Sequence, residues 1–223
     1  MKKQFAILII FFFSTAVFSQ NITQIDSVTV AMCHSLEGMP IGDDNTKINT
    51  LFQKHLPDFY KELGVFTQSK ADSIADKIYY RLQRNCNLFR EILDRLEVNK
   101  SDWEILKEKP ITKISKKDCT NFLNESVFYY KEYNGSIVNV LIKGNVWQET
   151  FEDGTFSKLV FISKTDGEFD LEFLESNNEM RMNFSVKGDI YNYGIFAKNE
   201  SSYSIWVKSK DNSFASFKLY SKK

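Results

Sequence analysis

The chain has 223 residues, of which 43% are hydrophobic and 15% aromatic, and its 29 basic residues balance its 29 acidic ones. This composition excludes a disordered, collagen-like or coiled-coil chain, and the neutral charge balance argues against a nucleic-acid partner. The length allows one domain or two small ones.

Residues 1–19 have the order of a secretory signal peptide. Lys2 and Lys3 precede an apolar run over residues 5–13, and cleavage after Ser19 would place small residues at both recognised positions. The apolar run is shorter than the roughly 20 residues that span a bilayer. We therefore expect a secreted or periplasmic protein without a transmembrane segment after cleavage.

Residues 20–97 carry apolar side chains at helical spacing, which predicts a domain built as a three-helix bundle. A capping-box-like pair, Thr23 with Asp26, predicts the start of the first helix, and Gly38 its end. The second helix is expected over about 46–63, where apolar residues again line one face.

The third expected helix has the clearest pattern. Residues 69–72 predict its start, and seven apolar residues then recur at steps of three or four up to Leu96. Cys86 lies on this stripe and Cys33 on or beside the stripe of the first helix, so we expect a disulfide between them, with Cys119 left over. The alternative is that these cysteines are reduced and act as small buried hydrophobes.

Residues 98–117 are rich in lysine and contain Pro110, which predicts a solvated connector. From residue 118 to residue 223 the apolar period changes to two, and short runs of Phe, Tyr, Val and Ile alternate with turn residues. The candidate strands are 126–131, 137–143, 146–152, 155–163, 168–175, 180–187, 190–198, 202–209 and 214–220.

These strands follow one another through tight turns, and no helix is expected between them. The pattern predicts an antiparallel β meander of eight to nine strands that curls into a barrel, with a β-sandwich as the alternative. The fold class expected for the whole chain is therefore α+β.

No assembled catalytic motif is present in the sequence, and with only two histidines a His-based metal site is not expected. We expect no catalytic residues and no cofactor. The strongest charge feature is the acidic segment 149–179, in which Asp166, Glu168, Asp170 and Glu172 alternate. A solvated strand face explains it best, and a carboxylate-based hydrolase is the alternative.

The β half contains eleven Phe, seven Tyr and two Trp residues. A barrel of about eight strands either fills its interior with such rings or leaves a cavity for a small apolar ligand. If a cavity exists, ring-bearing strand residues are the candidates to line it. They are Phe128, Trp147, Phe169, Phe184, Tyr193 and Trp206.

The run from Ile142 to Glu149 resembles small, uncharacterised secreted proteins of Gram-negative bacteria. Those proteins combine a Cys-containing helical amino-terminal part with a lipocalin-like β part, and the resemblance extends over about 20–220. It implies that two-part fold and transfers no functional residue. The segments 202–208 and 217–219 are also similar to the end of the β-sandwich sorting domains of the type 9 secretion system, although the glycine before the tyrosine is missing.

Together these observations favour a non-catalytic binding or interaction module for a small apolar ligand or a protein partner. A secreted hydrolase and a surface or sorting element are the alternatives.

Overall fold

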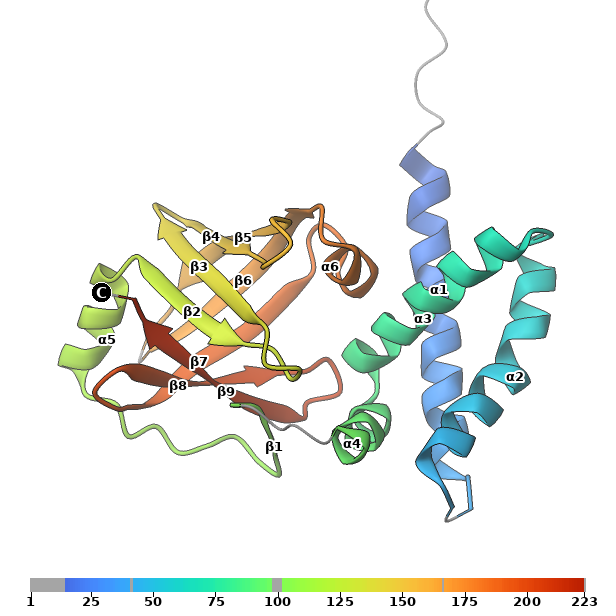
Figure 1. Cartoon of the computed structure of the whole chain (residues 1–223), viewed down its shortest axis with the longest axis horizontal. Coiled ribbons are helices and arrows are strands. Elements are labelled where there is room, and N and C mark those ends of the chain that lie inside the picture. Colours follow the sequence, from blue (N-terminus) through green and yellow to red (C-terminus); the bar gives the residue numbers. More distant parts are fainter. Residues whose placement is uncertain (1–14, 41, 98–101, 166, 223) are drawn as a thin grey trace, which may run out of the picture.

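A computed structural model describes residues 15–40, 42–97, 102–165 and 167–222 (Figure 1). The expected signal peptide lies largely outside the described residues. Four helices are followed by a closed antiparallel β-barrel, which confirms the α+β fold class. In Figure 1 the helices stand beside the barrel, on the side where the short helix α6 lies. The helices are α1 (Thr15–Glu37), α2 (Asp44–Glu62), α3 (Gln68–Asn85) and α4 (Asn87–Leu96).

Helix α1 starts earlier than the capping pair predicts. Thr23 and Asp26 lie within the helix, because residues 15–22 contain no Gly or Pro and the helix continues back through them. Asp26 has a different role there, since its carboxylate binds Arg81 of α3. Helix α2 begins close to the expected position, and Asp43 accepts a hydrogen bond from the backbone N–H of Thr46 at 2.7 Å.

The expected third helix is in fact two helices, α3 and α4, which meet at Cys86. Its backbone is extended (φ −135°, ψ 112°) and its sulfur forms the expected disulfide with Cys33, with the Cα atoms 5.6 Å apart. A straight helix over residues 68–96 would be about 43 Å long at 1.5 Å per residue, longer than its neighbours. The turn instead brings Phe89 and Ile92 into the apolar core of the bundle.

Eight strands in chain order form the barrel. Strand β9 pairs with β8 on one side and with the start of β2 on the other, with Ser221 opposite Phe128. This closure excludes the sandwich, and the short strand β1 (Glu104–Leu106) extends the sheet beside the first half of β9. The barrel strands are β2 (Val127–Lys131), β3 (Ile137–Lys143), β4 (Val146–Thr150), β5 (Phe156–Ser163), β6 (Glu168–Ser176), β7 (Ile190–Lys198), β8 (Ser202–Lys208) and β9 (Phe214–Ser221).

The prediction of a strand over residues 180–187 is wrong. Residues 180–187 alternate like a strand, but 180–184 belong to helix α6 (Glu179–Phe184). Asn178 caps this helix by accepting a hydrogen bond from the backbone N–H of Arg181 at 3.1 Å. The acidic Glu179 in the first turn adds a favourable dipole interaction. The helix directs Arg181 toward the barrel interior instead of leaving it on a wet strand face.

Helix α5 (Lys116–Asn124) closes one end of the barrel. Its Phe122 is buried and packs against the rings of Phe128, Phe169 and Tyr203, with ring centroids 5.2–5.7 Å apart. The aromatic rings therefore pack together at this end of the barrel, beside a pocket of about 730 Å³ that Phe122 and Phe169 also line. The other end faces α3, α4 and α6.

Candidate ligand-binding site

A cavity of about 1240 Å³ occupies the end of the barrel opposite α5. Its wall combines inward-facing strand residues with residues of α3, α4 and α6, so the helices and the barrel build it together. Residues two positions apart on one strand, such as Trp147 and Glu149 on β4, share the interior face. Trp103 adds an aromatic wall, because its ring stacks on Phe217 with centroids 4.7 Å apart.

A charged cluster lies within this cavity. The guanidinium of Arg181 donates to the hydroxyl of Tyr130 at 2.7 Å and to the carboxylate of Glu132 at 2.5 Å. Its Nε lies 3.4 Å from the carboxylate of Glu149, which also accepts a 3.0 Å hydrogen bond from Tyr130. Burial alone would lower the pKa of Arg181, but the neighbouring groups, Glu132 first and then Tyr130 and Glu149, together outweigh it, and the net pKa lies well above the usual value. Arg181 therefore stays charged.

Two tyrosines of the cavity remain neutral at physiological pH. Burial raises the pKa of Tyr130 well above its ordinary value, and the nearby carboxylates add to this shift against the opposing charge of Arg181. Burial likewise raises the pKa of Tyr193, with Glu149 as the next contribution. Both hydroxyls can therefore act as hydrogen-bond donors to a guest or a wall residue.

The indole of Trp147 carries an unpaired donor. Trp147 is 2% exposed and belongs to the cavity lining, and its Nε1–H is buried without a hydrogen-bond partner in the described structure. A buried donor without a partner costs about 1–3 kcal/mol. An acceptor brought by a guest molecule would remove that cost.

The six expected lining residues lie in three places: the cavity, the closed end of the barrel and its outer face. Trp147 and Tyr193 line the cavity from the strands, and Phe184 does so from α6. Phe128 and Phe169 lie in the aromatic cluster around Phe122 at the closed end.

Trp206 does not line the cavity. Its strand neighbours Ile205 and Val207 face the interior, so its own ring faces outward. There the ring covers Gly194, and the ammonium of Lys109 lies 4.7 Å from its centroid.

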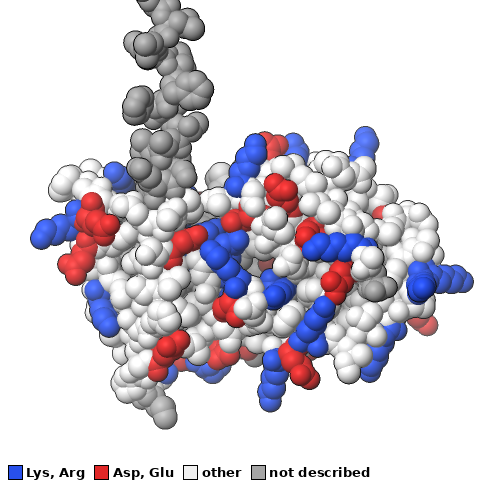
Figure 2. Space-filling view, turned by 180° about the vertical axis from the view of Figure 1, so that it is seen from behind, with Lys and Arg blue, Asp and Glu red and all other residues white. Residues whose placement is uncertain are grey.

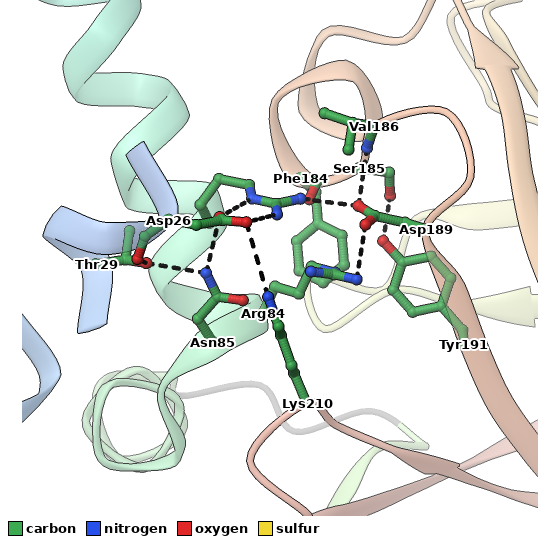
Figure 3. A network of polar contacts seen from close by, with 11 residues as sticks. Asp26, Thr29, Arg84, Asn85, Phe184, Ser185, Val186, Asp189, Tyr191 and Lys210 are labelled. Carbon is green, nitrogen blue, oxygen red and sulfur yellow. Dashed lines mark hydrogen bonds and ion pairs between the residues drawn. The ribbon is translucent and has the colours of Figure 1, made fainter. Parts of the chain in front are cut away.

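A polar network fixes the helices to the barrel beside the cavity (Figure 3). Figure 3 shows Asp26 of α1 and Asn85 of α3 on one side, with Asp189 and Tyr191 of the barrel on the other. Between them lies Arg81, which is 1% exposed and bonds to Asp26 at 2.5 Å and to Asp189 at 2.8 Å.

Two further arginine contacts extend this network. Arg84 also contacts Asp189, at 2.9 Å, and Arg81 donates to the backbone carbonyl of Phe184 in α6. Burial alone would raise the pKa of Asp26, but the hydrogen bond and charge of Arg81 outweigh it and lower the net pKa. Both groups are therefore charged in the folded protein.

The alternating acids of the segment 149–179 lie mainly on the outer face of β6. Glu168 pairs with Lys109 at 2.6 Å, and Asp170 pairs with Lys164 at 2.6 Å. Asp166 lies outside the described residues. In this segment Glu149, Glu152 and Asp153 line the cavity, and the hydroxyl of Tyr130 contacts both Glu149 and Glu132 of the turn after β2.

The face drawn in Figure 2 carries acidic and basic side chains interspersed, without a large patch of one sign. Within residues 15–40, 42–97, 102–165 and 167–222, no group of three His, Cys, Asp or Glu side chains could hold a metal ion. None of the helices described is both long enough and apolar enough to cross a membrane.

Sequence reasoning missed the charged cluster. Arg181 lies within the strand expected over 180–187, although Asn178 followed by Glu179 is a helix-start signal. For Glu149 a signal existed: it lies two residues after Trp147 on one strand and so shares its face. Comparison of the chain with models of known protein families and with curated proteins finds no match.

Proposed function

We propose that this protein is a non-catalytic binding protein that holds a small, largely apolar ligand in the barrel cavity. One observation carries the proposal: the barrel interior opens, at the end away from α5, into a cavity of about 1240 Å³, larger than the pocket of about 730 Å³ beside α5. That volume slightly exceeds the 300–1,000 Å³ of typical small-molecule sites. Its aromatic walls suit an apolar body, and its few polar groups would orient one end of the ligand.

We also place this function outside the cytoplasm. The charged and apolar order of residues 1–19 supports export, and a disulfide such as Cys33–Cys86 persists in oxidising compartments. Secretion and the periplasm both satisfy these observations.

The experiment is a fluorescence titration with N-phenyl-1-naphthylamine, a neutral apolar probe that brightens in dry surroundings. We expect saturable binding to the oxidised protein and its loss in Ala215→Phe, which projects a ring into the cavity from β9. The matched control is Gln148→Phe, which adds the same ring to the outer face of β4. Equal binding by both variants, or no binding by the unaltered protein, would contradict the proposal.

A carboxylate-based hydrolase is the second candidate, because Glu132 and Glu149 approach the same hydroxyl, that of Tyr130, inside one cavity. We rank it second because both carboxylates are engaged by Arg181 and Tyr130 rather than facing each other across an open cleft. The sorting-element alternative is weaker still, since residues 202–208 and 217–219 belong to strands of the closed barrel and not to a sandwich.

A further inference from the structure

We propose that the ligand is an organic amine: a molecule with an apolar body, a positively charged amino group and a nearby hydrogen-bond acceptor. This inference rests on the proposed binding function and names the chemistry that the polar end of the cavity selects. Three features carry it: the charge of the cluster around Arg181, the weak hold on Glu149, and the unpaired indole N–H of Trp147.

The cluster has more negative than positive charge. It combines one guanidinium, Arg181, with two carboxylates, Glu132 and Glu149, and the tyrosines beside it are neutral. Counted over these three side chains alone, the formal charge is −1 (one positive and two negative groups). In a site shielded from water, an additional carboxylate on a guest would be repelled, and an ammonium group would be attracted.

Glu149 is the carboxylate best placed to receive the amine. Arg181 is closer to Glu132, at 2.5 Å, than to Glu149, where the Nε contact is 3.4 Å long. The hydroxyl of Tyr130 donates to Glu149 at 3.0 Å. This hydroxyl is a neutral partner, so it leaves the negative charge of Glu149 in place. The side chain of Glu149 is 12% exposed, so an ammonium that reached it would meet little competition from bulk water.

Of the four other basic residues in the lining, the two arginines pair with acids from outside the lining, and Lys210 lies 3.8 Å from Asp26. Arg84 is held by Asp189 at 2.9 Å, and Arg90 is held by Asp211 at 2.8 Å. These pairs reduce the attraction that the mouth would otherwise offer to an anionic guest.

Trp147 supplies an independent reason to expect a guest with an acceptor. It lies two residues from Glu149 on the same face of β4, and its buried N–H has no partner in the described structure. An ether, hydroxyl or carbonyl oxygen near the amino group would satisfy it. The aromatic rings of the wall also favour a cation near their faces.

The test is isothermal titration of the full oxidised chain at pH 7 with three probes of similar size: 3-phenoxypropylamine, 3-phenoxypropan-1-ol and 4-phenoxybutyrate. We expect the amine to bind about tenfold more tightly than the alcohol, which is the difference expected for one charge-assisted hydrogen bond, and the carboxylate to bind most weakly. This comparison uses the unaltered protein and so does not depend on a variant that folds.

Two variants test whether Glu149 and Trp147 cause the preferences for the amino group and for the ether oxygen. Glu149→Gln should remove the preference for the amine over the alcohol, whereas Glu172→Gln, on the outer face of β6, should leave it unchanged. Trp147→Phe should abolish the advantage of 3-phenoxypropylamine over 4-phenylbutylamine, in which a methylene group replaces the ether oxygen.

The failures of the two proposals are distinguishable. If the carboxylate or the alcohol binds as tightly as the amine, or if the naphthylamine probe binds and none of the phenoxy probes does, the amine proposal is overturned and the binding function stands. If neither the naphthylamine nor any phenoxy probe binds, both proposals are overturned.

Discussion

Arg81 of α3 donates a 2.8 Å hydrogen bond to Asp189 of the barrel, although the two residues lie 108 positions apart in the sequence. The same guanidinium holds Asp26 of α1, so one buried side chain joins two helices to the end of the barrel that contains the cavity. The helices that complete the cavity wall are therefore held by directional, charge-assisted contacts as well as by apolar packing.

Arg81→Met tests this role. The substitution leaves the partly buried Asp26 without its main cation and leaves Asp189 with Arg84 alone. Loss of one partner of a buried ion pair costs about 3–5 kcal/mol. We expect a decrease of that order in the free energy of unfolding, measured by urea denaturation. Lys70→Met, at an exposed position of the same helix, is the control and should change it little. Equal effects of the two substitutions would show that the junction does not depend on Arg81.

Acid should weaken the same junction. The net pKa of Asp26 is lowered by Arg81, despite burial, and that of Asp211 is lowered by Ser213 and Arg90, again despite burial. A carboxylate with a lowered folded-state pKa adds stability above its unfolded pKa of about 4, and this stability is lost as the pH falls through the folded value. Urea midpoints should therefore decrease between about pH 4 and pH 2.

The variant Arg81→Met supplies the control for this pH dependence. Without the guanidinium the Asp26 contribution disappears, so the acid dependence should become shallower. A midpoint that is constant or rises as the pH falls from 4 to 2 in the unaltered protein would contradict the assignment.

The closed barrel and the disulfide could be predicted from the sequence because both depend on local patterns. Period-two runs with turn residues between them located eight of the strands, and the placement of Cys33 and Cys86 on helical stripes predicted their pairing. The break between α3 and α4 could not be predicted in this way. The apolar stripe continues through Cys86 without interruption. The break lies at the extended backbone of Cys86, whose sulfur is bonded to Cys33 of α1.

The polar end of the cavity could not be predicted for a similar reason. Arg181, Glu132 and Glu149 come from a helix, a turn and a strand, and their meeting depends on α6, which lies where the alternation of residues 180–187 predicts a strand. The phase error at Trp206 has another cause. Its large ring suggests an interior position, but the missing side chain of Gly194 provides a site for it on the outer face.

Gly194→Ala should be destabilising. A Cβ at this position would lie 2.4 Å from the Trp206 ring, so the indole or the strand would have to move. Overpacking of this kind typically costs about 1–3 kcal/mol. Gly38→Ala, where the added carbon would meet no atom within 4 Å, is the control in a thermal unfolding measurement. An unchanged melting temperature in Gly194→Ala would show that Trp206 is not fixed against β7.

Removing the disulfide should destabilise the helical bundle. The crosslink joins residues 53 positions apart, and the loop-closure relation gives about 4 kcal/mol for a loop of that length. We expect the double substitution Cys33→Ser with Cys86→Ser to lower the free energy of unfolding by about 2–4 kcal/mol in denaturant titrations. Cys119→Ser, outside the disulfide, should have a smaller effect. A double variant as stable as the unaltered protein would contradict the structural role of the bond.

If the barrel cavity holds a small molecule, the protein should carry it when isolated. The most direct measurement is native mass spectrometry of the protein purified from its own host, before and after extraction with organic solvent. We expect an additional small mass that extraction removes and that Ala215→Phe does not retain. Recovery of the unaltered protein at the mass of the bare polypeptide, together with no uptake of a neutral apolar probe, would contradict it.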